Sequence, residues 1–184
     1  MRIVFIGPPG AGKGTQSRRL ARYLNIPHLS TGDMLRLAIT EGSQVGQIAQ
    51  SYMQQGHLVP DQVIMQVVCD RLAQPDCEPG SLFDGIPRTL GQARSLDQYL
   101  AERGEAIDAA LDFRVPEEHL VARLAERKRC DDDPGMIRRR FRDFEAMTKP
   151  LRDYYEQRGL LHTIEGVGTV DQVFERIQRS LGIC

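Results

Sequence analysis

The segment GPPGAGKGTQ at 7–16 most constrains how this chain can fold, because it joins an apolar run to a stretch with helical periodicity. Glycines allow the tight backbone path in which successive N–H groups converge on an anion, and the next helix adds its positive dipole end. Gly7, Gly12 and Lys13 match the pattern G-x-x-x-x-G-K, although the usual hydroxyl residue comes one position late, at Thr15. The segment predicts a phosphate-binding loop rather than a glycine-rich turn with an incidental lysine.

Short apolar segments alternate with helical patterns along the chain, which is typical of βαβ units. We expect strands at 2–7, 27–30, 81–84, 110–115 and 160–165. We expect helices at 13–24, 31–41, 44–55, 61–73, 90–104, 117–127, 135–158 and 170–181. This order predicts an α/β, P-loop three-layer fold whose central five-stranded parallel sheet is flanked by helices. Ligands bind such sheets beyond the carboxyl ends of the strands, which is where the phosphate loop begins.

The length of 184 residues fits one domain, and 24 Lys and Arg against 25 Asp and Glu argue against a general polyanion binder. We therefore expect no nucleic-acid partner. The apolar runs are too short to span a bilayer and no signal peptide is recognisable, so we expect a cytoplasmic protein without membrane contact. The cysteines, which show no CxxC spacing, favour reduced thiols over zinc or disulfide use; they are Cys69, Cys77, Cys130 and Cys184.

The segment STGDMLR at 30–36 ends the second expected strand and opens a helix. Thr31 or Asp33 can cap that helix, a structural role that needs no ligand. Arg36 falls about a turn and a half inside the helix, one turn past Gly32, where it either faces a second anion or is solvated at the surface. Two stretches also interrupt the βα alternation, at 31–73 and 127–140, and we expect each to be an insertion that moves against the core.

In the segment LFDGIPRT at 82–89, an apolar strand ends in Asp84, where a carboxylate can hold a hydrated Mg²⁺ beside the first loop. Gly85 would let another backbone come close, and Arg88 either meets an anion or is a solvated arginine in a turn. Gln92, one helical turn further on, can offer an acceptor and a donor to the edge of a base.

With GPPGAGKGTQ, STGDMLR and DGIPRT in this order, the sequence resembles the nucleoside monophosphate kinases, most closely the adenylate kinases of the short-lid type. The resemblance covers essentially the whole chain and includes QQGHLVPD at 54–61 and the later IEGVGTVDQVF. It implies reversible transfer of the γ-phosphoryl group of Mg-ATP to AMP, giving two ADP. It also implies a monomeric single domain over 1–184, with an NMP-binding insertion at 30–59 and a short lid at 127–137.

The resemblance further implies the residues of each subsite. The ATP phosphates are expected at Gly10, Ala11, Gly12, Lys13, Gly14 and Thr15, with the ATP base near Gly168. AMP is expected at Thr31, Arg36, His57, Leu58, Val59, Gly85, Arg88 and Gln92. The transferring phosphoryl group is expected to meet Lys13 and Arg88 together with Arg127 on the ATP side and Arg129 and Arg140 on the AMP side. The metal is expected at Asp84 through water and, more weakly, at Thr15.

The sequence departs from the family pattern in two places. Ile86 stands where a phenylalanine is usual, which is a packing change with little effect on the chemistry. Short forms place several residues ending in Gly-Arg between the first two lid arginines, whereas only Lys128 lies between Arg127 and Arg129 here. The zinc-bearing long lid of other members is absent, and Cys130 alone cannot replace it.

Two other functions remain open at this point. A uridylate or cytidylate kinase would share the fold, but Thr31 and Gln92 favour AMP. A nucleotide-binding switch or regulatory module would bind ATP alone, and Arg36 and Arg88 argue against it because such a module needs no second phosphate site.

Overall fold

The computed structural model describes residues 1–55, 57, 59–127 and 134–183, with side chains described at all of these except 122, 125–127, 134–140, 142 and 143. Within this part of the chain, five parallel strands form one sheet in the order β2-β3-β1-β4-β5. The strands are β1 (Arg2–Ile6), β2 (His28–Ser30), β3 (Ser81–Asp84), β4 (Ala109–Arg114) and β5 (Leu161–Glu165). The predicted α/β fold with a five-stranded parallel sheet is confirmed.

The helices follow the strands in the expected alternation. They are α1 (Lys13–Leu24), α2 (Thr31–Thr40), α3 (Gln44–Gln54), α4 (Asp61–Leu72), α5 (Leu90–Ala101), α6 (Glu117–Arg127), α7 (Pro134–Glu156) and α8 (Val170–Leu181), with a 3₁₀ turn, η1 (Pro75–Cys77). The largest difference from the predicted bounds is at α5, which was expected to continue to residue 104. The helix ends earlier because the chain turns through Gly104, whose φ of +73° is left-handed.

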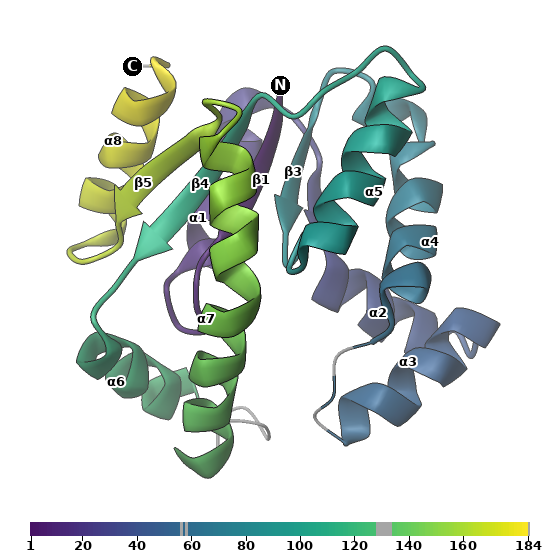
Figure 1. Cartoon of the computed structure of the whole chain (residues 1–184), viewed down its shortest axis with the longest axis horizontal. Helices are drawn as coiled ribbons and strands as arrows, with labels where there is room; N and C mark the ends of the chain where they lie inside the picture. The colour runs from purple at the N-terminus through teal and green to yellow at the C-terminus, as the bar shows by residue number, and fades with distance from the viewer. Residues whose placement is uncertain (56, 58, 128–133, 184) are drawn as a thin grey trace.

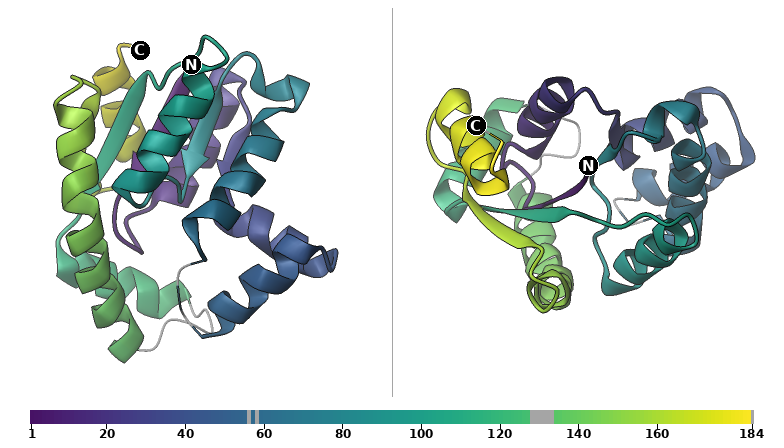
Figure 2. Two further views of the ribbon diagram at one scale, coloured as in Figure 1. Left: turned by 45° about the vertical axis from the view of Figure 1, so that its right-hand side comes forward. Right: turned by 90° about the horizontal axis from the view of Figure 1, so that it is seen from above.

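Helices cover both faces of the sheet and form a three-layer structure. Figure 2 shows α1 and α8 on one face and α5 and α7 on the other. Alternate residues of β1 supply the two cores: Ile3 and Phe5 pack in one hydrophobic cluster, and Val4 packs in the other. Because both faces are buried, the strand is an uninterrupted apolar run, as parallel strands generally are.

The strands all point towards the same end of the molecule, and α2, α3 and α6 lie beyond that end (Figure 1). The helices α2 and α3 form most of the segment predicted as the NMP-binding insertion, 30–59. They pack closely, since a Cβ atom added at Gly46 would lie 2.0 Å from the carbonyl oxygen of Ala38. The predicted lid, 127–137, includes the last residue of α6 and the first turn of α7, and its residues 128–133 lie outside the described residues.

The cysteines of the described part, Cys69 and Cys77, are free thiols. Burial raises the pKa of both thiols, so they remain protonated at neutral pH. Cys130 and Cys184 lie outside the described residues. None of the helices described is long and apolar enough to cross a membrane.

Candidate active site

The phosphate loop follows β1 and enters α1 through left-handed glycines. Gly10 and Gly12 have φ values of +83° and +88°, which L side chains rarely adopt. Gly12 is the N-cap of α1, and as a glycine it has no side chain that could accept from the N–H groups of the helix. The first turn, which is fully described, contains no acidic residue. An anion at the positive end of the helix dipole would therefore meet no competing side chain from the cap or the first turn.

Lys13 lies folded over this loop. Its Nζ atom donates to the carbonyl oxygen of Gly7 at 2.5 Å and to that of Pro8 at 2.9 Å. These contacts hold the ammonium group at the loop itself, where an outer phosphate of a nucleotide would arrive. The charge also acts on Asp84, the last residue of β3, which is the neighbour of β1.

Asp84 is an ionised carboxylate beside the loop. Its Oδ2 atom lies 3.3 Å from His28 Nε2 and 3.4 Å from Ser17 Oγ. Burial opposes ionisation, but the hydrogen bond with His28 and the charge of Lys13 outweigh it and hold the pKa of Asp84 below its ordinary value. A Cβ atom added at Gly14 would lie 3.5 Å from the same oxygen, so the first turn of α1 touches the carboxylate.

His28 and Ser17 were not predicted as site residues, although Ser17 Oγ lies 2.9 Å from His28 Nε2 and both face Asp84. The sequence gives no signal for His28, because only the pairing of β2 with β3 in the structure sets it beside Asp84. It gives none for Ser17 either, since a small polar residue inside a helix is ordinary.

A second group of predicted residues meets where β2 and β3 end. Thr31 is buried and its hydroxyl donates to the carbonyl oxygen of Asp84 at 3.5 Å. Gly85 has a φ of +89°, and a Cβ atom there would lie only 2.6 Å from Thr31 Oγ1. Arg88 reaches back to donate from Nε to the carbonyl oxygen of Gly85 at 2.9 Å. The structure thus brings Thr31, Gly85 and Arg88 together.

Arg36 lies on the same side, on α2. Its guanidinium group forms an ion pair with Asp33 and lies 3.3 Å from where a Cβ atom of Gly32 would stand. Burial opposes ionisation of Asp33, but the hydrogen bond with Arg36 outweighs this effect and keeps the pKa of Asp33 below its ordinary value. The N-cap of α2 is Ser30, whose hydroxyl accepts from the Asp33 N–H. The expectation that Thr31 or Asp33 caps this helix is therefore wrong, because the strand ends one residue before Thr31.

Gln92 is buried at the start of α5, and its amide is held at both ends. Its Oε1 atom accepts from the Arg88 N–H at 2.7 Å, and its Nε2 atom donates to Asp61 Oδ1 at 2.7 Å. Asp61 was not predicted as a site residue, and this contact was missed. In the segment predicted to line the AMP base, Val59 is buried, His57 is exposed, and Leu58 lies outside the described residues.

The turn after β5 carries Gly168, the residue predicted near the ATP base. Its φ is +120°, and a Cβ atom there would lie 2.6 Å from Gln172 Oε1. Arg123 of α6 donates to the carbonyl oxygen of Gly166 at 3.1 Å and ties the helix to this turn. Arg123 was not predicted, although it lies one helical turn before Arg127 and so shares its face.

The predicted lid arginines are only partly within the described structure. Arg127 is the last residue of α6 and Arg140 belongs to α7, but neither side chain is among those described. Arg129 lies outside the described residues. Their roles stay predictions.

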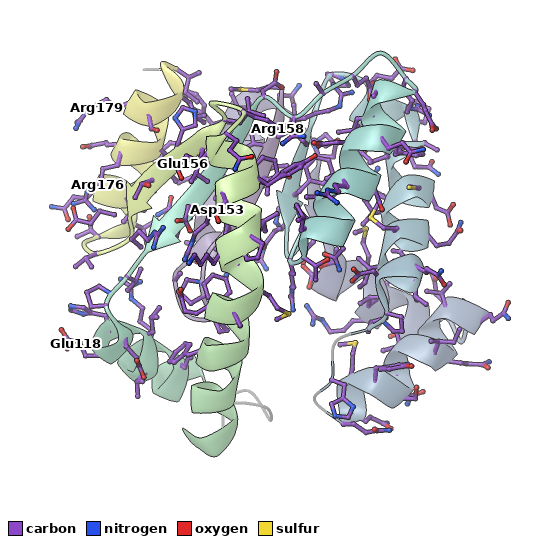
Figure 3. All side chains as sticks on the ribbon, in the orientation of Figure 1. Glu118, Asp153, Glu156, Arg158, Arg176 and Arg179 are labelled. Atoms are coloured by element: carbon purple, nitrogen blue, oxygen red, sulfur yellow. The ribbon has the colours of Figure 1, made fainter. Side chains whose placement is uncertain are left out.

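A shallow hollow of about 310 Å³ lies elsewhere, against the edge strand β5, and includes Arg176 and Arg179 in its lining. Figure 3 shows both arginines on α8 at the outer edge of the molecule. Arg176 is already engaged there, since it donates to the carbonyl oxygen of Glu165 at 2.8 Å. This hollow is not part of the candidate site.

The glycine loop between β1 and α1 defines a nucleotide-binding protein of the P-loop class, and an arginine-bearing turn follows β3, the strand paired with β1. The family model for adenylate kinase matches residues 5–160. Adenylate kinases from Mycolicibacterium vanbaalenii and Thermobifida fusca are 48% and 46% identical, covering 99% and 98% of both chains. One from Archaeoglobus fulgidus is 39% identical, covering 98% of both chains. The chain belongs to the adenylate kinase family.

Proposed function

We propose that this protein transfers the γ-phosphoryl group of Mg-ATP to AMP, reversibly, giving two ADP. The observation that carries the proposal is the placement of the two anion regions. The loop at 7–16 follows β1, and the turn with Gly85 and Arg88 follows β3, which is hydrogen-bonded to β1. Phosphates held at both positions would lie close to each other, as direct transfer between two nucleotides requires.

On the donor side, the ATP phosphates would occupy the loop made by Gly10, Ala11, Gly12, Lys13, Gly14 and Thr15. Lys13 would exchange its carbonyl partners for phosphate oxygens, a stronger charge-assisted contact. The base would lie towards Gly168, near the turn that Arg123 contacts.

On the acceptor side, Arg36 and Arg88 would hold the AMP phosphate and Gln92 would meet the edge of the base. Thr31 and Gly85 would lie beside the nucleotide, and only glycine fits at position 85, because a Cβ atom there would lie 2.6 Å from Thr31 Oγ1. The segment with His57, Leu58 and Val59 would line the adenine. Arg36 must leave Asp33 to bind the phosphate, so the ion pair competes with AMP.

The residues at the loop fit a magnesium ion bound with ATP. Asp84 supplies an ionised, partly accessible carboxylate and Thr15 a hydroxyl, and Mg²⁺ prefers such oxygen ligands while keeping several waters. The ion would neutralise charge on the phosphate oxygens. Asp84, held by His28 and Ser17, would orient the water ligands.

Catalysis would rest on positioned positive charge, because phosphoryl transfer needs no protein nucleophile. We assign Lys13, Arg88, Arg127, Arg129 and Arg140 to this role. The insertion at 30–59 and the lid at 127–137 would close over the substrates and exclude water. We also expect a monomer, which light scattering of the purified protein would check.

A coupled assay tests the proposal. Purified protein is given Mg-ATP with AMP, CMP, UMP or GMP, and ADP formation is followed. We expect turnover to be greatest with AMP. Greatest turnover with CMP or UMP would instead identify a pyrimidine nucleotide kinase, and no turnover with any acceptor would identify a binding module.

A further inference from the structure

We propose that Asp61 fixes the direction of the Gln92 amide and thereby makes the acceptor site select adenine over bases of the hypoxanthine and guanine type. The inference rests on the proposed function, in which Gln92 meets the base of AMP. It assigns Asp61 the role of a positioning residue, which acts through Gln92 and does not touch the nucleotide itself.

The Asp61 carboxylate joins the first turns of two helices. It belongs to α4, which begins just after the segment proposed to line the base, and it contacts α5, which begins just after Arg88. Its Oδ1 atom accepts from Gln92 Nε2 at 2.7 Å, and its Oδ2 atom accepts from Thr89 Oγ1 at 2.8 Å. Thr89, the N-cap of α5, in turn accepts from the Gln92 N–H at 3.1 Å.

These partners leave only one direction for the amide of Gln92. The Arg88 N–H, 2.7 Å from Oε1, can only donate, and an ionised carboxylate can only accept. A flipped amide would set its NH₂ group against the Arg88 N–H and its oxygen against the Asp61 carboxylate. Both contacts would become repulsive, so the hydrogen-bond network itself assigns the nitrogen and the oxygen.

The amide keeps capacity for a ligand. A glutamine amide has two N–H donors and two oxygen lone pairs. Among the residues that the structure describes, the Gln92 amide uses one N–H on Asp61 and one lone pair on the Arg88 N–H. One donor and one acceptor remain, in an order that Asp61 and Arg88 determine.

That order decides which base edge is complementary. Adenine presents a donor at its 6-amino group and an acceptor at N1, which match the oxygen and the nitrogen of an amide. Hypoxanthine presents an acceptor at O6 and a donor at N1, the reverse order. Hypoxanthine bound in the same position as adenine would therefore need the flipped amide of Gln92, which Asp61 opposes.

The test compares AMP with inosine monophosphate, whose base differs from adenine only along this edge. In Asp61→Asn the new side chain can donate as well as accept, so only the Arg88 N–H still opposes the flipped amide. We expect the ratio of kcat/KM for AMP to that for inosine monophosphate to fall about tenfold, the worth of one hydrogen bond, with KM for ATP unchanged. If both acceptors lose kcat/KM by the same factor, Asp61 only supports the fold and the inference is overturned.

Asp70→Asn is the matched control. Asp70 lies on the same helix, is exposed, and accepts from Gln66 Nε2 at 2.9 Å, so the variant removes an equivalent carboxylate–amide contact away from the site. We expect it to leave the acceptor ratio unchanged. A fall equal to that of Asp61→Asn would show a general effect of charge on α4 and would overturn the inference.

Gln92→Ala separates this inference from the proposed function. If this variant keeps the wild-type acceptor ratio, Gln92 does not read the base, and both the assignment of Gln92 and the inference fail. If Gln92→Ala lowers the ratio but Asp61→Asn does not, the assignment of Gln92 stands and the inference alone fails.

A measurement on the unmodified protein keeps the inference testable if Asp61→Asn does not fold. In the nitrogen-15 NMR spectrum, one Nε2 proton of Gln92 is expected downfield and slow to exchange, as a proton bonded to a carboxylate is. Two equivalent, rapidly exchanging protons would overturn the inference.

Discussion

The Nζ atom of Lys13 lies 2.5 Å from the carbonyl oxygen of Gly7, so the lysine at the end of the phosphate loop donates a hydrogen bond to the residue that begins it. Replacement of this lysine by methionine keeps the length of the side chain and removes its charge. We expect Lys13→Met to lower kcat by about 10²–10³-fold, because one positioned charge at the transferring group is lost. Steady-state kinetics measure the loss. The control is Lys149→Met, on the exposed surface of α7, and near-normal rates in Lys13→Met would contradict this interpretation of the loop.

Arg88→Ala should weaken the binding of AMP, the proposed phosphoryl acceptor. The side chain is aimed by its bond to the Gly85 carbonyl oxygen, 2.9 Å away, towards the region proposed for the AMP phosphate. We expect KM for AMP to rise at least about tenfold, with KM for ATP changed less than twofold, since a charge-assisted contact is worth about 1.5–3 kcal/mol. Arg94→Ala, an exposed position on the same helix, should leave both constants unchanged. Equal rises in both KM values would contradict a role confined to AMP.

Gly85→Ala tests the close approach of the two strand ends. A methyl group there would lie 2.6 Å from Thr31 Oγ1, and Thr31 is buried and cannot move aside freely. Gly104→Ala is matched in backbone, with a φ of +73°, and meets nothing within 4 Å among the atoms described. We expect Gly104→Ala to lower the free energy of unfolding by about 1 kcal/mol, which is the strain of an alanine in the left-handed region alone. Gly85→Ala should lower the free energy of unfolding by more than this and should also raise KM for AMP. Denaturant unfolding and steady-state kinetics measure the two effects. Equal effects of the two variants would exclude the contact with Thr31.

Asp84 should make the stability depend on pH in a defined direction. Its pKa in the folded protein lies below the ordinary value of 3.8. Its stabilisation is therefore complete above that value and is lost as the pH falls through the lower, folded pKa. We expect Asp84→Asn to be less stable than the wild type at neutral pH, and the difference in free energy of unfolding to shrink below about pH 4. Urea unfolding of both proteins across this pH range measures the difference. A difference in free energy of unfolding that does not change with pH would contradict the stabilising role of the Asp84 carboxylate.

Much of the fold could be predicted from local patterns. Ile3, Val4 and Phe5 form an apolar run bounded by a glycine loop, and such a run is buried whichever way its side chains alternate. Predicted and observed bounds agree for α8, where Thr169 and Gln172 form a capping box. These signals lie within a few residues of one another, so the sequence alone contains them.

The contacts that assemble the site could not be predicted in this way. His28 meets Asp84, and Asp61 meets Gln92, across separations of 56 and 31 residues. Neither pair differs from ordinary surface or capping residues until the strand order brings the elements together. The local sequence and the resemblance to a family both indicated Arg88 and Gln92 as site residues, but not the side chains that contact them.

The hydrogen-bonded pair of strands β1 and β3 has a consequence for how this enzyme can diverge. Phe5 and Asp84 are register partners, so the lengthwise alignment of the donor loop and the acceptor turn is set by the main chain. At the proposed nucleotide sites, side chains around either base could then be exchanged without changing the distance between the loop and the turn. Preference for a nucleotide and the geometry of transfer are thus separable properties of the chain.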